Sequence, residues 1–294
     1  MLTKYKTIFI SDIHLGTRDS KADDLNQFLK SNTCDTLYLV GDIIDGWKIQ
    51  QNKWRWKQSH TNVVRRILGF AKRGTRVVFV IGNHDEFLRP LVPFGIGFGR
   101  VEICNQSEHI GVDGKHYLVT HGDLFDGITR LAPWLSFLGD KSYDVILSIN
   151  NKFNWIRRKF GFGYWSLSRY LKLRVKKAVD FIFQFEKNMV AYCKKRGFDG
   201  VICGHIHHPE IKTIDGVVYM NDGDWVESCS ALVEHHDGRW EILIYSQENN
   251  NVADDIDSST HQRPARSTRK NRDDVPGPTK LPASTKYNQM AVEV

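Results

Sequence analysis

Five short polar motifs, each directly after an apolar run, restrict the fold of this chain more than any other feature of its sequence. The runs are rich in valine and isoleucine, which indicates buried strands; they are Thr7–Ile10, Thr36–Val40, Val77–Ile81, Tyr117–Thr120 and Gly200–Cys203. The motifs that follow them are Asp12-Ile13-His14, Gly41-Asp42-Ile43-Ile44-Asp45, Gly82-Asn83-His84-Asp85, His121-Gly122-Asp123 and Gly204-His205-Ile206-His207. Ligands of an open α/β sheet bind beyond the carboxyl ends of its strands. We therefore expect these strand ends to build one site.

The order of helical and extended patterns indicates an α/β fold. Residues 21–31 and 60–73 carry apolar side chains at helical spacing between the first three strands, and this βαβ order implies parallel pairing. Asp215-Gly216 lies between the extended segments Glu210–Ile214 and Val217–Asn221, and Asp237-Gly238 lies between Ser230–His235 and Trp240–Tyr245. Each dipeptide predicts an antiparallel hairpin. Together these patterns predict two sheets packed as a sandwich with helices outside.

The basic charge of the chain is concentrated in one segment. Residues 128–196 hold fifteen Lys or Arg and four Asp or Glu, a balance of +11 against +7 for the whole chain, and aromatic residues are interleaved with the cations. A crossover between two strands needs far fewer residues, so we expect a helical cap insertion over the site. Its surface has three interpretations: a lipid-binding and membrane-facing cap, a packed helical hairpin with a solvated basic face, or a nucleic-acid surface. The segment Lys53–Lys57 (KWRWK) is open to the same interpretations.

Four negative features limit the class of protein. Residues 248–294 are almost free of aliphatic side chains, so we expect a disordered polar tail. No apolar run approaches the roughly 20 residues that a membrane helix requires, and no signal-peptide pattern follows Met1, so we expect a cytoplasmic protein. The five cysteines form no CxxC pair, which argues against a disulfide framework and a zinc knuckle.

Oxygen and nitrogen donors dominate the five motifs, and no cysteine joins them. The candidate metal ligands are Asp12, His14, Asp42, Asn83, His121, His205 and His207. Such donors suit hard or borderline divalent ions, namely Mn²⁺, Mg²⁺, Fe²⁺ or Zn²⁺. Seven ligands exceed what one catalytic ion needs while keeping an open position, so they indicate two ions with a bridging carboxylate. Two such ions clamp a phosphoryl group and activate a water.

In this order, the motifs resemble those of the calcineurin-like metallophosphoesterase superfamily, over residues 5–247. The resemblance implies a four-layer α/β/β/α sandwich with a helical cap, in a metallophosphoesterase domain of residues 1–247. It also implies the ligand sets: Asp12, His14, Asp42 and His207 for the first ion, with Asp42 bridging, and Asn83, His121 and His205 for the second. His84 would stabilise transition-state charge or protonate the leaving oxygen, and Asp85 would orient its ring.

A narrower resemblance concerns the substrate. Gly41–Trp47, the long insertion and Gly223-Asp224-Trp225 resemble the UDP-2,3-diacylglucosamine pyrophosphohydrolases of lipid A synthesis. This implies Mn²⁺-dependent release of UMP from a nucleotide-linked glycolipid, acyl chains under the cap, and contact with the anionic inner face of the membrane. His84 stands where those enzymes carry arginine. A nuclease or cyclic-nucleotide phosphodiesterase therefore stays open, as does a metal-binding scaffold without turnover, and nucleic acid stays open as a partner.

Several side chains near the motifs have two interpretations each. Trp47 and Trp225 contact either substrate or the core. Asp45 is either a partner of a metal ligand or a helix N-cap, and Asp123 either orients His121 or caps a turn. The histidines without a motif are expected at surface or strand positions; they are His60, His109, His116, His235, His236 and His261.

Overall fold

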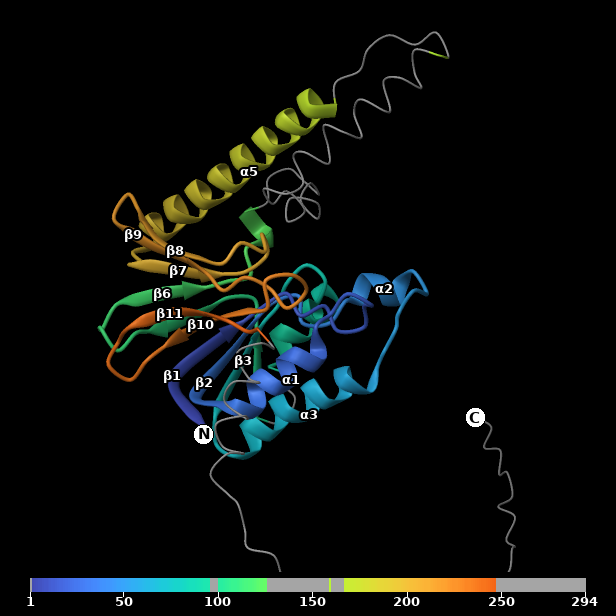
Figure 1. The fold of residues 1–294 in the computed structure, drawn as a ribbon. Helices are drawn as coiled ribbons and strands as arrows, with labels where there is room; N and C mark the ends of the chain where they lie inside the picture. Colours follow the sequence, from blue (N-terminus) through green and yellow to red (C-terminus); the bar gives the residue numbers. More distant parts are fainter. Residues whose placement is uncertain (1, 96–99, 126–158, 160–166, 247–294) are drawn as a thin grey trace, which may run out of the picture. The chain divides into compact units, whose positions relative to one another are not determined.

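The computed structural model of the chain describes residues 2–95, 100–125, 159 and 167–246. Two sheets lie face to face between helices in this part of the chain. Figure 1 shows the layers in the order α5, the β5–β9 sheet, the β1–β4 sheet, and then α1 with α3. The predicted α/β/β/α sandwich is confirmed.

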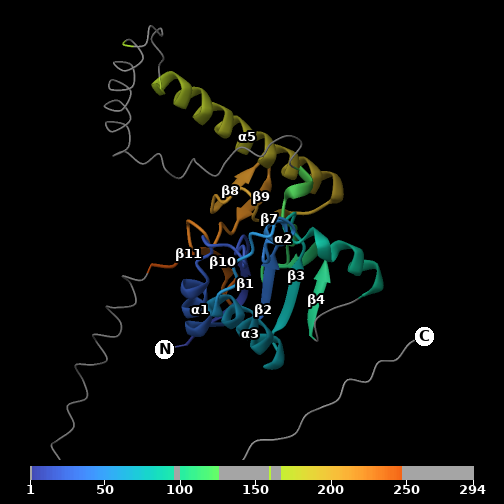
Figure 2. The ribbon, with the colours of Figure 1, turned by 90° about the vertical axis from the view of Figure 1, so that its right-hand side faces the viewer.

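The first sheet has the strand order β11-β10-β1-β2-β3-β4. Its strands are β1 (Thr3–Ile10), β2 (Asn32–Val40), β3 (Arg76–Val80), β4 (Val101–Cys104), β10 (Ser230–Glu234) and β11 (Trp240–Ile244). The strands β1 to β4, seen side by side in Figure 2, pair in parallel, whereas β10 and β11 continue the sheet antiparallel. The sequence patterns predicted these strands except β4, a short edge strand with a charged residue inside it.

The second sheet has the strand order β5-β6-β7-β9-β8. Its strands are β5 (Ser107–Ile110), β6 (His116–Val119), β7 (Gly200–Cys203), β8 (Glu210–Ile214) and β9 (Val217–Asn221). The hairpin of β8 and β9 has the predicted bounds, because Asp215 and Gly216 adopt left-handed φ angles of 50° and 81° at its turn. The parallel pairs β6–β7 and β7–β9 bring the ends of β6 and β7 to the same edge.

The described part of the chain has the helices α1 (Ala22–Ser31), α2 (Gly46–Gln50), α3 (Gln58–Lys72) and α5 (Leu167–Arg196), with the 3-10 helices η1 (Glu86–Phe94) and η2 (Asp123–Phe125).

Apolar clusters of described residues hold the layers together. Phe9, Tyr117 and Met220 belong to the cluster between the sheets. Leu25 and Phe70 place α1 and α3 against the first sheet. Packing on both sides of each sheet removes these apolar faces from water, and this burial stabilises the fold.

Part of helix α5 belongs to the sandwich, which corrects the predicted extent of the cap. Its later turns bury Phe185, Met189 and Cys193 against Val201 and Tyr219 of the second sheet, so this portion is the outer layer of the sandwich. Residues 126–158 and 160–166 of the expected cap, and the expected tail 248–294, lie outside the described residues. None of the described helices combines the length and the apolar content needed to span a membrane.

Trp225 lies in the core, which corrects its prediction as a substrate contact. The indole is fully buried, with ring centroids 5.3 Å from Phe28 and 6.3 Å from Tyr245. Its backbone N–H donates to the Asp12 carbonyl at 3.1 Å, and its carbonyl accepts from the Lys21 N–H at 2.8 Å. Trp225 therefore joins the loop before β10 to α1 and to the first polar motif.

Replacing Trp225 with alanine is expected to lower the free energy of unfolding by about 3–5 kcal/mol, because a large buried ring leaves a cavity. Urea denaturation followed by circular dichroism measures the loss. Leu68→Ala is the matched control, since Leu68 on α3 is 44% exposed and its truncation removes little packing. Equal effects of the two substitutions would contradict the buried role of Trp225.

Candidate metal centre

The five polar motifs meet at the carboxyl ends of β1, β2, β3, β6 and β7. Backbone hydrogen bonds join their loops: the His14 N–H donates to the Asp42 carbonyl at 2.9 Å, and the Gly204 N–H donates to the His121 carbonyl at 3.2 Å. The second of these bonds connects loops that follow neighbouring parallel strands of one sheet. The structure therefore brings together the side chains that the sequence predicted as ligands.

Most of the predicted ligands have an unusual backbone conformation. Asp12, His14, Asp42, His205 and His207 have φ angles between 48° and 71°, a left-handed region that side chains other than glycine rarely adopt. Each such residue costs on the order of 1–3 kcal/mol and persists only where the surroundings impose it. Strain of this kind clusters at functional sites, and here it turns consecutive loop side chains toward one point.

Each of the two central carboxylates uses one oxygen for the protein and directs the other into the site. Asp12 Oδ2 accepts the His205 N–H at 2.9 Å, and Asp42 Oδ1 accepts the His84 N–H at 2.8 Å. The remaining oxygens face imidazoles: Asp12 Oδ1 is 3.1 Å from His207 Nε2, and Asp42 Oδ2 is 3.3 Å from His121 Nε2. One oxygen of each carboxylate therefore faces ring nitrogens and no backbone donor.

The donor atoms form three groups. One holds Asp12, His14 and His207, a second holds Asp42, His121 and His205, and a third holds His14, Asp45 and His84, with the atoms of each group within 4.8 Å of one another. The first two groups contain only predicted ligands. Asp42 Oδ2 also lies 3.9 Å from His14 Nε2, so this carboxylate reaches both groups.

Asn83 completes the second group, with its Oδ1 3.2 Å from His121 Nε2. The oxygen and nitrogen donors lie as close together as ligands that share an ion, and they fit borderline divalent metals.

The His121 ring is oriented for metal binding. Its Nδ1 lies 2.8 Å from the Val40 carbonyl, which only accepts, so Nδ1 carries the proton and the Nε2 lone pair faces Asp42 and Asn83. Gly41 makes room for this ring, because a Cβ at that position would lie 2.4 Å from the imidazole and the residue has a φ of 84°. The glycine that opens the second motif thus has a steric role.

The electrostatics of the centre favour positive charge. Burial alone would raise the pKa of Asp42, but His121 and His14 lower it to about 2. Burial opposes protonation of His14, yet Asp12, Asp45 and Asp42 raise its pKa to about 10. The pKa of Asp12 also falls well below its usual range, since His207 and His14 outweigh the effect of burial. Ionised carboxylates in a buried cluster attract cations, as a metal centre requires.

His84 is held by Asp45 rather than by its neighbour Asp85. His84 Nδ1 lies 3.2 Å from Asp45 Oδ1, and His84 Nε2 lies 3.8 Å from Asp42 Oδ2. The fully buried Asp85 carboxylate instead accepts the N–H groups of Ile43 and Ile44 at 3.0 and 2.7 Å. The prediction that Asp85 orients the His84 ring is therefore wrong: its carboxylate holds the loop after β2. Burial, together with the charge of Asp42, raises the pKa of Asp85 to about 7.

Asp45 fills both of its predicted roles. One oxygen accepts the Lys48 N–H at 2.9 Å and caps α2, and the other lies 3.7 Å from His14 Nδ1. Asp123, by contrast, forms an ion pair of 2.6 Å with Arg89 of η1. It acts on His121 only through its charge, which contributes to the raised pKa of that ring.

Three residues that support the metal centre were not identified from the sequence. His60 is fully buried on α3, where its Nδ1 accepts the Gly16 N–H at 3.1 Å and holds the loop after His14, so its predicted surface or strand position is wrong. Ser11 lies 2.6 Å from Asp12 and 2.7 Å from the buried Asp222, which fixes the Asp12 carboxylate. Burial raises the pKa of Asp222 well above its usual range. These contacts join distant segments and have no local sequence signal.

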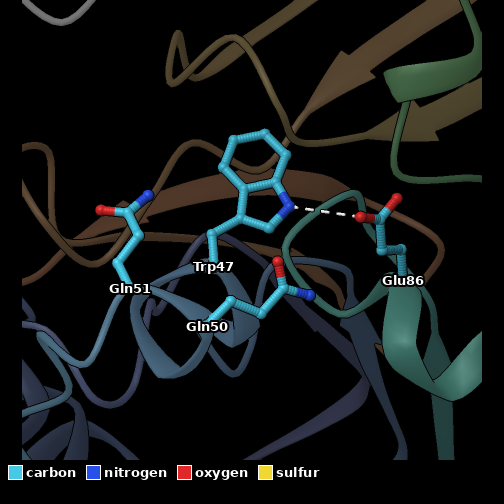
Figure 3. A pocket seen from close by; sticks show the side chains of 4 residues that line it. All are labelled: Trp47, Gln50, Gln51 and Glu86. Carbon is cyan, nitrogen blue, oxygen red and sulfur yellow. Dashed lines mark hydrogen bonds between the residues drawn. The ribbon is translucent and has the colours of Figure 1, made fainter.

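A cavity of about 620 Å³ is lined by Trp47, Gln50, Gln51 and Glu86 (Figure 3). The ring centroids of Trp47 and His84 are 3.9 Å apart. Trp47 is thus placed between the cavity and the predicted catalytic histidine, and its contact with substrate stays a prediction.

Comparisons with known proteins show which proteins this chain is similar to. A model of the family described as calcineurin-like phosphoesterase matches residues 5–209. The chain is 23% identical over 240 residues to the UDP-2,3-diacylglucosamine hydrolase of Wigglesworthia glossinidia brevipalpis, covering 77% of this chain and 89% of that protein. It is 24% identical over 245 residues to the protein of that name from Vibrio cholerae serotype O1, covering 77% and 93%. The phosphoesterase Yfce from E. coli aligns with a TM-score of 0.39 at 15% identity, covering 82% of this chain and 99% of that one.

The family match spans all five motifs, from Asp12 to His207. It covers well over half of the chain, and the residues inside it form the two donor groups around Asp42. The chain therefore belongs to the calcineurin-like phosphoesterase family of metal-dependent phosphoester hydrolases.

Proposed function

We propose that this protein uses two divalent metal ions, both Mn²⁺, to hydrolyse a nucleotide-linked glycolipid pyrophosphate of the UDP-2,3-diacylglucosamine type. The products would be UMP and the lipid 1-phosphate. The main support for the proposal is the position of Asp42, whose Oδ2 lies 3.9 Å from His14 Nε2 and 3.3 Å from His121 Nε2 and so reaches a donor group on each side.

The assignment of ligands follows the two groups. Asp12, His14, Asp42 and His207 would hold one ion, and Asp42, Asn83, His121 and His205 would hold the other. When bound, such ions supply Lewis acidity to phosphoryl oxygens and lower the pKa of a water that they share. The protein contributes buried, ionised carboxylates and oriented rings that need no rearrangement when substrate enters.

His84 is placed to act on the leaving group. Its Nε2 lies 3.8 Å from Asp42 Oδ2, and the ring is 18% exposed, so it borders the centre and is open to substrate. The Asp45 carboxylate lies 3.2 Å from Nδ1 and orients the ring. A protonated His84 donates a hydrogen bond or a proton to the oxygen on which negative charge develops.

The substrate class rests on two observations. Relatives called UDP-2,3-diacylglucosamine hydrolase align over 77% of the chain. The balance of +11 in residues 128–196, interleaved with aromatic side chains, suits acyl chains beside anionic headgroups. We therefore place the protein in the cytoplasm, at the inner face of the membrane.

A nuclease is the second candidate, and one surface favours it. Trp54 and Trp56 are 43% and 40% exposed, with ring centroids 5.1 Å apart, among the cations of Lys53–Lys57. The Arg55 N–H donates to the Gly16 carbonyl at 2.8 Å, which places this segment beside the loop of His14. Exposed aromatics next to cations bind single-stranded nucleic acid by stacking.

A hydrolysis panel with Mn²⁺ separates the candidates. UDP-2,3-diacylglucosamine, single-stranded DNA, single-stranded RNA and bis(p-nitrophenyl) phosphate are each incubated with the full chain. We expect release of UMP from the glycolipid and no cleavage of the nucleic acids. Nuclease activity without UMP release would overturn the glycolipid assignment, and metal binding without any turnover would favour a scaffold.

A further inference from the structure

The cavity lined by Trp47 lies next to His84, because the rings of these two residues pack on each other. Trp47 and Gln50 come from α2, Gln51 is the residue after this helix, and Glu86 begins η1. Its volume of about 620 Å³ is that of a site for a small ligand. The wall nearest the metal centre is Trp47, which packs on His84. A substrate whose phosphate reaches Asp42 therefore extends one of its ends past His84 toward this cavity.

Trp47 presents a fixed aromatic wall. Its ring lies on His84 with an interplanar angle of 33°, and its Nε1 approaches Glu86 Oε1 at 3.4 Å. In Figure 3 the indole stands between Gln51 on one side and Glu86 on the other. Two contacts on different sides restrict the ring, so little rotamer entropy is lost when a flat group stacks on it.

The two glutamines supply hydrogen bonds that the protein does not use. Both side chains are exposed, and within the part of the chain that the structure describes their amides have no side-chain partner. The Gln51 N–H donates to the Trp47 carbonyl at 3.1 Å, which fixes the end of α2. A primary amide offers both donors and an acceptor, so it complements the polar edge of a flat heterocycle.

The charge of the lining excludes other parts of a substrate. The described lining contains one carboxylate, Glu86, and no cation, so it disfavours a phosphate. Free amides disfavour an acyl chain, because an apolar group would take away their water without replacing its hydrogen bonds. An uncharged flat ring with polar edges, attached to hydroxyl groups that donate to Glu86, satisfies all four residues.

We infer that the cavity formed by Trp47, Gln50, Gln51 and Glu86 is the subsite for the nucleoside half of the substrate. This inference rests on the proposed phosphoesterase function and deepens it. The nucleobase stacks on Trp47, its edge meets the two glutamines, and the ribose hydroxyls donate to Glu86. The other half of the substrate then lies on the far side of the metal centre.

Two substrates with the same leaving group test the subsite. Uridine 5′-(p-nitrophenyl phosphate) carries a nucleoside, and methyl p-nitrophenyl phosphate carries a methyl group in its place. We expect the full chain with Mn²⁺ to prefer the uridine ester in kcat/KM. The double variant Gln50→Ala/Gln51→Ala should lower the ratio of the two kcat/KM values about tenfold, as expected for two lost hydrogen bonds. Gln58→Ala on α3, an exposed glutamine paired with Asn62, is the matched control and should keep the ratio.

Binding supplies a readout that does not require turnover. Isothermal titration should show UMP binding about tenfold more tightly than glucosamine 1-phosphate, and the double variant should lose this preference. AMP in place of UMP tests whether the base itself is selected. Equal binding of UMP and glucosamine 1-phosphate, or an unchanged ratio in the double variant, would overturn the subsite. Failure to cleave the glycolipid with the uridine preference intact would instead overturn only the glycolipid assignment.

Discussion

Replacing Asp42 with asparagine is expected to lower the rate of phosphodiester hydrolysis about a thousandfold and to weaken metal binding. Asp42 Oδ2 reaches His14 Nε2 at 3.9 Å and His121 Nε2 at 3.3 Å, so its negative charge serves both donor groups. The loss of several kcal/mol of transition-state stabilisation corresponds to a decrease of about a thousandfold in kcat. The rate with bis(p-nitrophenyl) phosphate and the Mn²⁺ content after gel filtration measure the two effects.

The substitution is conservative for the fold. An asparagine Oδ1 still accepts the His84 N–H that Asp42 Oδ1 accepts at 2.8 Å. Asp35→Asn is the matched control, because that carboxylate lies at the surface and pairs with Lys4 and Lys6. Asp35→Asn should retain both activity and metal. Near-normal hydrolysis by Asp42→Asn would contradict the bridging role.

Replacing His84 with alanine is expected to lower kcat about 10²- to 10⁴-fold, the range for the loss of a positioned acid. The Mn²⁺ content should stay unchanged, because His84 is not one of the seven predicted ligands, although it forms a third donor group with His14 and Asp45. The dependence on the leaving group identifies its role. An acid that protonates the leaving oxygen matters for an alkyl phosphodiester and little for p-nitrophenolate, whereas a group that stabilises phosphoryl charge affects both substrates.

His116→Ala is the control for this experiment. His116 lies half-exposed on β6, where it pairs with Glu108 on β5, and its loss should leave kcat unchanged for either substrate. A variant of His84 that loses metal would instead identify the residue as a ligand. A variant with normal kcat for the alkyl diester would show that the contact between His84 and Asp45 has no part in catalysis.

Local patterns predicted most of the sandwich. The apolar runs and the Asp-Gly turns depend on neighbours in sequence, so the hairpin of β8 and β9 has its predicted bounds. The strand β4 was not predicted, because four residues at a sheet edge, one of them charged, form too short a hydrophobic pattern. The segment 128–196 was predicted as one insertion, although part of α5 has the same role in packing as any outer helix.

The residue types and their order in five motifs determined the chemistry of this protein from the sequence alone. Asp, Asn and His at successive strand ends meet because the carboxyl ends of parallel strands lie at the same edge of a sheet. This proximity does not depend on the conformation of the loops. Only the tertiary structure decided which neighbour each side chain contacts. The Asp85 carboxylate accepts the Ile43 N–H, and the Asp45 carboxylate contacts the His84 ring. Trp225 enters the core, and Trp47 lines a cavity. Such choices depend on contacts between distant segments, where sequence spacing carries no information.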